Sequence, residues 1–254
     1  MKPKPQPQLD TLIFEVRYAY GHLYFDRCGQ TIIDIQRECD GWVPGQVDVQ
    51  TGYLERPDKG FRVGFSSIKF DFTADRADNE DIRIIAKEAS TIWNIIQANL
   101  GLSEFPRIGC RLQYLLPTES IDEAERMLKS AKLNVLVPDA LKNSGYKLKT
   151  RQITVVLSRE DMEYRIILGT VTRVEGIDPS ALIKGDPRAL PKSQQKVRIE
   201  TLKRLSEYRA NPMYAVQLDI DCVKLQPETV GVEEYIKNQT QIVRDDFLQI
   251  LEKL

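Results

Sequence analysis

The stretch MYAVQLDIDCVKLQPETVGVEEYIKNQTQIVRDDFLQILEKL, from Met213 to Leu254, decides the fold. Between Met213 and Val223 apolar and polar side chains alternate, which is the period-two pattern of a half-buried strand. After Pro227 and Thr229 the apolar residues recur at helical spacing instead, and they are Val232, Tyr235, Ile236, Ile242, Val243, Phe247, Ile250 and Leu251. The stretch therefore predicts a strand, a short turn and one long amphipathic helix.

The residues before 117 contain the same two kinds of pattern. Helical spacing is clearest from Ile82 to Leu100, where Gly101 follows at the position of a left-handed cap. Asp78 or Asn79 is expected to cap the start of this helix. In chain order the patterns predict a strand over 12–19, a helix over 29–40, strands over 47–53 and 61–72, a helix over 82–100 and a strand over 107–116.

The strand predicted over 61–72 changes its pattern half-way. Its apolar positions are odd-numbered up to Phe65 and even-numbered from Ile68 to Phe72. Successive side chains of a strand point to opposite faces, so one extra residue is needed to keep all of these on one face. We therefore predict a β-bulge at Ser66–Ser67.

The second part of the chain begins with a helix signal. Ser120 and Glu123 have the spacing of a capping box, which predicts a helix that runs to about Lys132. Downstream we expect a hairpin of strands over 146–157 and 164–174, a loop over 175–191, a basic helix over 193–209 and then the C-terminal strand and helix.

These elements predict an α+β fold of two ferredoxin-like halves, of βαββαβ type, that share a mostly antiparallel sheet. The long C-terminal helix would cover that sheet. We expect residues 1–10 to form a disordered Pro-rich tail, residues 11–116 an N-terminal α+β half and residues 117–254 a C-terminal α+β half. The loop 175–191 and the C-terminal helix belong to the second half.

The composition is that of an ordinary globular protein. Of 254 residues, 42% are hydrophobic and 29% charged, and the net charge is −1. The apolar runs are shorter than a membrane span needs, and the N-terminal residues lack the apolar region of a secretory signal. Four scattered cysteines indicate reduced thiols in the cytoplasm, and a single histidine excludes a multi-histidine metal site within one chain.

Three segments carry a resemblance to a known family: Phe14–Arg17, Arg107–Tyr114, and Leu218–Asp221 followed by a long helix. They look like a sporadically distributed, uncharacterised bacterial protein family of about 250 residues, and the resemblance covers most of the chain. It implies the strand and helix order described above, and it implies no catalytic residue. A patchy distribution of this kind would suit genes of mobile elements or of host defence.

The middle segment is the most informative part of this resemblance. The family strand reads Arg-x-Gly-x-Arg-Tyr, and Arg107, Gly109 and Arg111 match that pattern here. Leu112 and Gln113 interrupt it.

Asp219 and Asp221 form the first candidate site. Two positions apart on a strand, both carboxylates project from one face, as in a pair that binds Mg²⁺ for phosphoryl transfer. Such a site also needs a third acidic ligand, for which Asp48, Asp71 and Glu15 are candidates, and a phosphate-binding loop. No Gly-rich loop accompanies them. The alternative interpretation places both carboxylates on a solvated sheet face, opposite Arg17 or Arg111 of neighbouring strands.

A basic segment is the second candidate site. Between Asn143 and Asn211 the chain has 14 Lys or Arg against 8 Asp or Glu, which favours binding to a nucleic-acid backbone. The aromatic signature of RNA-binding sheets is missing, and charged faces are more often simply solvated. The candidate nucleic-acid-binding residues are Lys147, Lys149, Arg151, Lys192, Lys196, Arg198, Lys203 and Arg204.

Cys28 and His22 are the remaining candidates for chemistry. Cys28 lies near a predicted helix start, where its thiol pKa would be lowered, and His22 is close in sequence. No third group that could orient the histidine is identifiable. We therefore expect Cys28 to pack as a small apolar residue and His22 to be an ordinary hydrogen-bonding residue.

No catalytic constellation emerges, so the leading interpretation is a cytoplasmic protein that recognises a protein or other macromolecule without catalysis or a cofactor. Nucleic-acid binding and a metal-dependent enzyme are the alternatives. Tyr235 and Phe247 of the C-terminal helix are expected to pack into the core. A homodimer built on that helix, or on an exposed edge strand, is the other arrangement that the sequence allows.

Overall fold

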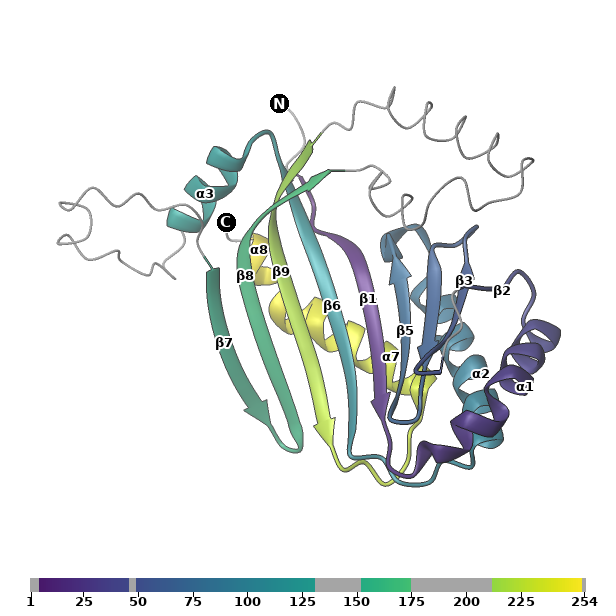
Figure 1. The fold of residues 1–254 in the computed structure, drawn as a ribbon. Coiled ribbons are helices and arrows are strands. Elements are labelled where there is room, and N and C mark those ends of the chain that lie inside the picture. Colours follow the sequence, from purple (N-terminus) through teal and green to yellow (C-terminus); the bar gives the residue numbers. More distant parts are fainter. Residues whose placement is uncertain (1–4, 46–48, 131–151, 175–211, 253–254) are drawn as a thin grey trace, which may run out of the picture.

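The computed structural model describes residues 5–45, 49–130, 152–174 and 212–252. Within them, nine strands form one antiparallel sheet in the order β2-β3-β4-β5-β1-β6-β9-β8-β7 (Figure 1). The strands are β1 (Gln8–Arg17), β2 (Val43–Pro44), β3 (Gly52–Arg56), β4 (Phe61–Phe65), β5 (Lys69–Asp75), β6 (Arg107–Thr118), β7 (Gln152–Arg159), β8 (Met162–Val174) and β9 (Pro212–Leu225).

The long helices pack on one face of this sheet, and no helix of the described residues covers its other face (Figure 1). These helices are α1 (Tyr24–Glu38), α2 (Ile82–Leu100) and α7 (Val232–Ile242), and α3 (Ile121–Ser130) and α8 (Gln249–Glu252) cover the far end of the same face. Short 3-10 turns, η1 (Gly21–Leu23) and η2 (Ala77–Asn79), follow β1 and β5. No helix of the described residues is long and apolar enough to cross a membrane.

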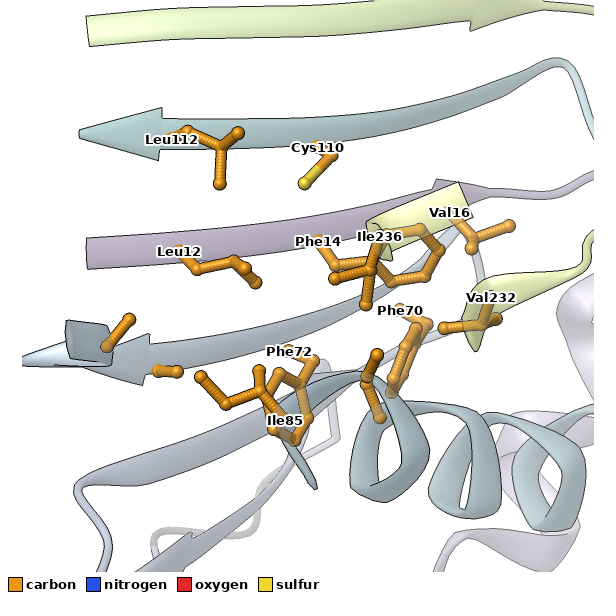
Figure 2. Close-up of a cluster of buried hydrophobic side chains, with 14 of the residues drawn as sticks. Leu12, Phe14, Val16, Phe70, Phe72, Ile85, Cys110, Leu112, Val232 and Ile236 are labelled. Carbon is orange, nitrogen blue, oxygen red and sulfur yellow. The ribbon is translucent and has the colours of Figure 1, made fainter. Parts of the chain in front are cut away.

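The core lies between the helices and the covered sheet face. Figure 2 shows Phe14 of β1 between residues of the adjacent strands, with Ile236 of α7 in front of it and Val232 of α7 beside Phe70. These side chains are almost completely buried. Alternate positions of each central strand point into this cluster, as period-two patterning requires. At roughly 25 cal/mol per Å² of apolar surface removed from water, this layer is the main source of stability.

Helix α2 (Ile82–Leu100) confirms the helix predicted from the apolar stripe, and it ends before Gly101 as predicted. Gly101 caps it in the left-handed conformation, at φ 63°. At the other end the cap differs from the prediction, because Asp81, and not Asp78 or Asn79, accepts a hydrogen bond from the Arg83 backbone amide. The side chain of the residue directly before the helix can reach the unpaired backbone amides of its first turn, and Asp81 has that position.

The predicted bulge at Ser66–Ser67 is wrong. Strands β4 and β5 are separate antiparallel partners, with Phe65 opposite Phe70 and a tight turn between them. The Ser66 hydroxyl accepts hydrogen bonds from the Ile68 and Lys69 amides inside this turn. A change of parity marks a hairpin as well as a bulge, because both keep the phenylalanines on one face.

The prediction of two ferredoxin-like halves is also wrong. Strand β6, where the two predicted halves would meet, pairs with β1 on one side and with β9 along its whole length on the other, so the sheet is not divided into two halves at this point. The last strand, β9, enters between β6 and β8. The coarser expectation of helices on an antiparallel sheet holds. Period-two patterns locate strands but do not identify their partners, and the partners define the fold.

Both ends of the chain depart from the sequence-based boundaries. Strand β1 begins at Gln8, inside the segment 1–10 that we expected to be a tail. The single long C-terminal helix is instead α7, a π-helical segment η4 (Val243–Phe247) and α8. The Leu248 amide donates to the Val243 carbonyl oxygen at 3.1 Å, the wider turn of a π-helix. Its extra residue brings Val243 and Leu251 onto one buried face, although eight positions of a regular helix would separate them by about 80°.

Candidate functional site

The sheet face opposite the helices carries a network of ionic side chains on its central strands β1, β6 and β9. Odd-numbered residues of these strands point to this face, because the even-numbered ones fill the core. The network has two parts, one around Arg107 and one around Asp219.

Arg107 connects three strands. Its guanidinium donates to the Glu15 carboxylate on β1 and, at 3.1 Å, to Oδ2 of Asp221 on β9. Arg17 also donates to Glu15, through Nε at 2.9 Å. Gly109 makes room for this bridge, because a Cβ added there would lie 3.3 Å from a terminal nitrogen of Arg107. The matched Arg-x-Gly pattern thus has a local physical reason.

Asp219 is the most buried charge of the network, at 6% exposure. Arg111 donates to both carboxylate oxygens, from Nε at 2.8 Å and from Nη2 at 2.5 Å. Gln113 adds a third donor, Nε2, at 3.1 Å. This bidentate geometry is the strong form of a charge-assisted hydrogen bond. The structure confirms the interpretation that Asp219 faces Arg111 across strands, whereas Arg17 contacts Glu15 instead.

Burial and neighbouring charges oppose one another in this network. Burial raises the pKa of Asp221, and the Glu15 and Asp219 carboxylates raise it further, while Arg107 and Arg111 lower it. The hydrogen bonds to Asp219 raise the pKa of the Arg111 guanidinium. Each buried carboxylate therefore has a guanidinium partner that stabilises its ionised form.

These contacts bear on the metal-dependent alternative. The carboxylates of Asp219 and Asp221 both accept hydrogen bonds from arginine, so a divalent cation would have to displace a guanidinium from each. In the part of the chain that the structure describes, no three His, Cys, Asp or Glu side chains are grouped to hold a metal ion. A metal site at Asp219 and Asp221 stays a prediction.

The nucleic-acid alternative rests on side chains that lie outside the described residues. They are Lys147, Lys149, Arg151, Lys192, Lys196, Arg198, Lys203 and Arg204. This alternative also stays a prediction.

Cys28 and His22 are placed differently from one another. Helix α1 begins at Tyr24, so Cys28 lies in its second turn and packs against the core, where its sulfur is near Gly52. His22 is exposed in η1, before the helix. The packing confirms the expectation that Cys28 behaves as a small apolar residue.

The aromatic residues of the C-terminal helix, Tyr235 and Phe247, pack against the core. The Tyr235 hydroxyl donates to the Cys222 carbonyl oxygen at 3.0 Å, and the Tyr235 ring meets Phe14 at a centroid distance of 6.1 Å. Phe247 packs against Tyr164 at 5.5 Å. Core packing was the expected role of this helix.

The two edges of the sheet differ, and the sequence patterns did not reveal this. At one edge, β2 has two residues and ends in Pro44. At the other, β7 has eight residues, contains no proline, and pairs with β8 in an unbroken register. Val155, Val156 and Leu157 of β7 are 39%, 55% and 46% exposed. The signal in the sequence was a run of apolar residues without alternation, which is unusual for a half-buried strand.

Comparison with models of known protein families finds no match for this chain, and comparison with curated proteins finds none either. The geometry of the structure is therefore what supports a function.

Proposed function

We propose that this protein is a non-enzymatic recognition protein that binds another polypeptide by adding a strand of it to the edge of β7. The observation that carries the proposal is that no described element protects this edge. A long edge strand presents a row of unpaired N–H and C=O groups, and soluble proteins usually block such an edge with charges, proline, a bulge or a very short strand. Strand β2 has two of these protections.

Apart from Arg159 at its end, strand β7 has none of the four. From Gln152 to Ser158 it contains no charged residue, and its register with β8 shows no bulge. Its apolar side chains are exposed on both faces of the sheet, Val156 on one face and Val155 and Leu157 on the other. Main-chain hydrogen bonds would supply affinity to an added strand, and these side chains would select its residues.

A pull-down from the native host tests the proposal, with the tagged wild-type chain, a Val156→Lys variant and a Val49→Lys control. Lysine on an edge strand opposes pairing, so Val156→Lys should recover at least tenfold less of the partner. Val49 is 76% exposed and lies outside β7, so the control should recover as much partner as the wild type.

Equal recovery of a stoichiometric partner by wild type and Val156→Lys would contradict the proposal. Recovery of nuclease-sensitive RNA or DNA in place of a protein would favour the basic segment 143–211. Thermal unfolding followed by circular dichroism confirms that both lysine variants are folded.

A further inference from the structure

The central residues of β7 form a near-palindrome about Val156. In the sequence Thr-Val-Val-Leu-Ser, from 154 to 158, a β-hydroxyl residue stands at each end and an aliphatic residue on each side of the centre. Such a strand is complementary to itself when it is paired antiparallel. A two-fold axis perpendicular to the sheet, midway between the Val156 residues of the two copies, produces that pairing.

The side chains match in this arrangement. The axis keeps each sheet face on its own side, so residues whose numbers are equally far from 156 meet on the same face. Val156 then lies beside its own copy, Val155 lies opposite Leu157, and Thr154 lies opposite Ser158. No like charges meet, since residues 152–158 are uncharged. Aliphatic and hydroxyl pairs of this kind stabilise neighbouring strands.

The backbone groups match as well. Arg159 and Met162 are paired across a two-residue turn, so they form a hydrogen-bonded pair and the bonding positions toward β8 continue at alternate residues. The N–H and C=O groups of Thr154, Val156 and Ser158 therefore point away from β8. These are the residues that the two-fold axis brings opposite one another.

We infer that a second copy of this chain occupies the β7 edge when no other partner is present. The inference rests on the proposed function, because it names an occupant of the same edge. Two sheets joined at β7 make one continuous sheet with both network faces on the same side. A foreign strand has to displace the second copy, so dimerisation and partner binding compete.

Sedimentation velocity of the full chain over a range of concentrations tests the inference. The wild type and the Val49→Lys control should sediment as dimers, and Val156→Lys should sediment as a monomer. A Val156→Cys variant should form a disulfide-linked dimer with oxidised glutathione as the electron acceptor, because its two thiols meet at the axis. A Val49→Cys variant should not.

Two results would overturn the inference: a monomeric wild type at every concentration, or a dimer that Val156→Lys does not dissociate. The failure of the proposed function is a separate result. A monomeric wild type whose partner is still lost in Val156→Lys would reject the second copy and keep strand addition. A β7-linked dimer whose foreign partner binds Val156→Lys as well as the wild type would keep the second copy and reject the addition of a foreign strand at β7.

Discussion

At the scale of single residues, the sheet face opposite the helices is organised by arginines that reach diagonally between strands. Arg111 is opposite Asp221 in the register, yet its guanidinium pairs with Asp219. Arg107 extends over Gly109 in a similar way and contacts two strands at once. The consequence is that buried carboxylates depend on partially exposed guanidiniums.

Because of this dependence, removing Arg111 and neutralising Asp219 should have unequal effects on the free energy of unfolding. Replacing Arg111 by methionine leaves the buried Asp219 carboxylate with Gln113 alone, and we expect a loss of about 3 kcal/mol in the free energy of unfolding. Asp219→Asn removes the buried charge and keeps one acceptor oxygen for Arg111, and it should cost about 1 kcal/mol. Urea unfolding of the two variants and of the double variant measures both losses, and equal losses would contradict this account.

Another single residue, Asp81, stabilises the N-terminal end of helix α2. Asp81 caps α2, and hydrogen bonds from the Arg83 side chain, followed by the Arg83 amide, lower its pKa from 3.8 to about 2. A lowered pKa in the folded state means that the ionised carboxylate stabilises the fold above pH 3.8. This stabilisation disappears as the pH falls toward about 2.

We therefore expect Asp81→Asn to lower the melting temperature at pH values above 3.8 and to have a smaller effect as the pH approaches 2. Asparagine still caps the helix, so the pH-dependent part of the difference in melting temperature reports the contribution of the charge alone. Asp40→Asn, which removes an exposed carboxylate in the turn after α1, is the matched control. A melting difference for Asp81→Asn that does not change with pH would contradict this role of the ionised carboxylate.

At the scale of whole elements, the two edge strands show how a strand's environment decides its role. Strand β2 and strand β7 both end the sheet, but only β7 offers a long uncharged row of backbone groups. The C-terminal helix shows the converse. Its apolar stripe suits a partner helix equally well, and the contacts of Tyr235 with β9 and β1 place it in the core.

At the scale of the molecule, one sheet and one core join both parts of the chain. Strand β6 needs β1 on one side and β9 on the other. Helix α7 supplies Val232 and Ile236 to the cluster around Phe14 (Figure 2). The residues before 119 therefore form a sheet whose core is completed by residues after 211.

We expect a fragment of residues 1–118 to lack a cooperative thermal transition, because its core is uncovered and β6 becomes an unpaired edge. Circular dichroism during heating measures this. Adding a separately produced fragment 119–254 should restore the transition. A fragment 1–118 that melts as sharply as the full chain would show that the first part folds independently.

The sequence by itself determined the elements whose information is local. The stripe from Ile82 to Leu100 and the left-handed glycine after it specify α2, and alternation specifies β6 and β9, because periodicity and capping depend on near neighbours. The same alternation placed Asp219 and Asp221 on one face and suggested Arg111 as a partner. Local patterns could not distinguish a bulge from a turn at Ser66.

Only the tertiary structure decided the strand order, the diagonal partners of the carboxylates and the strand that is left at the edge. Each of these depends on pairing between residues far apart in the chain, and a period-two pattern fits any partner strand of the same length. The exposure of Val156 is the clearest case. The residue is an ordinary core candidate by sequence, and it becomes a candidate binding residue because no described strand pairs with β7 beyond it.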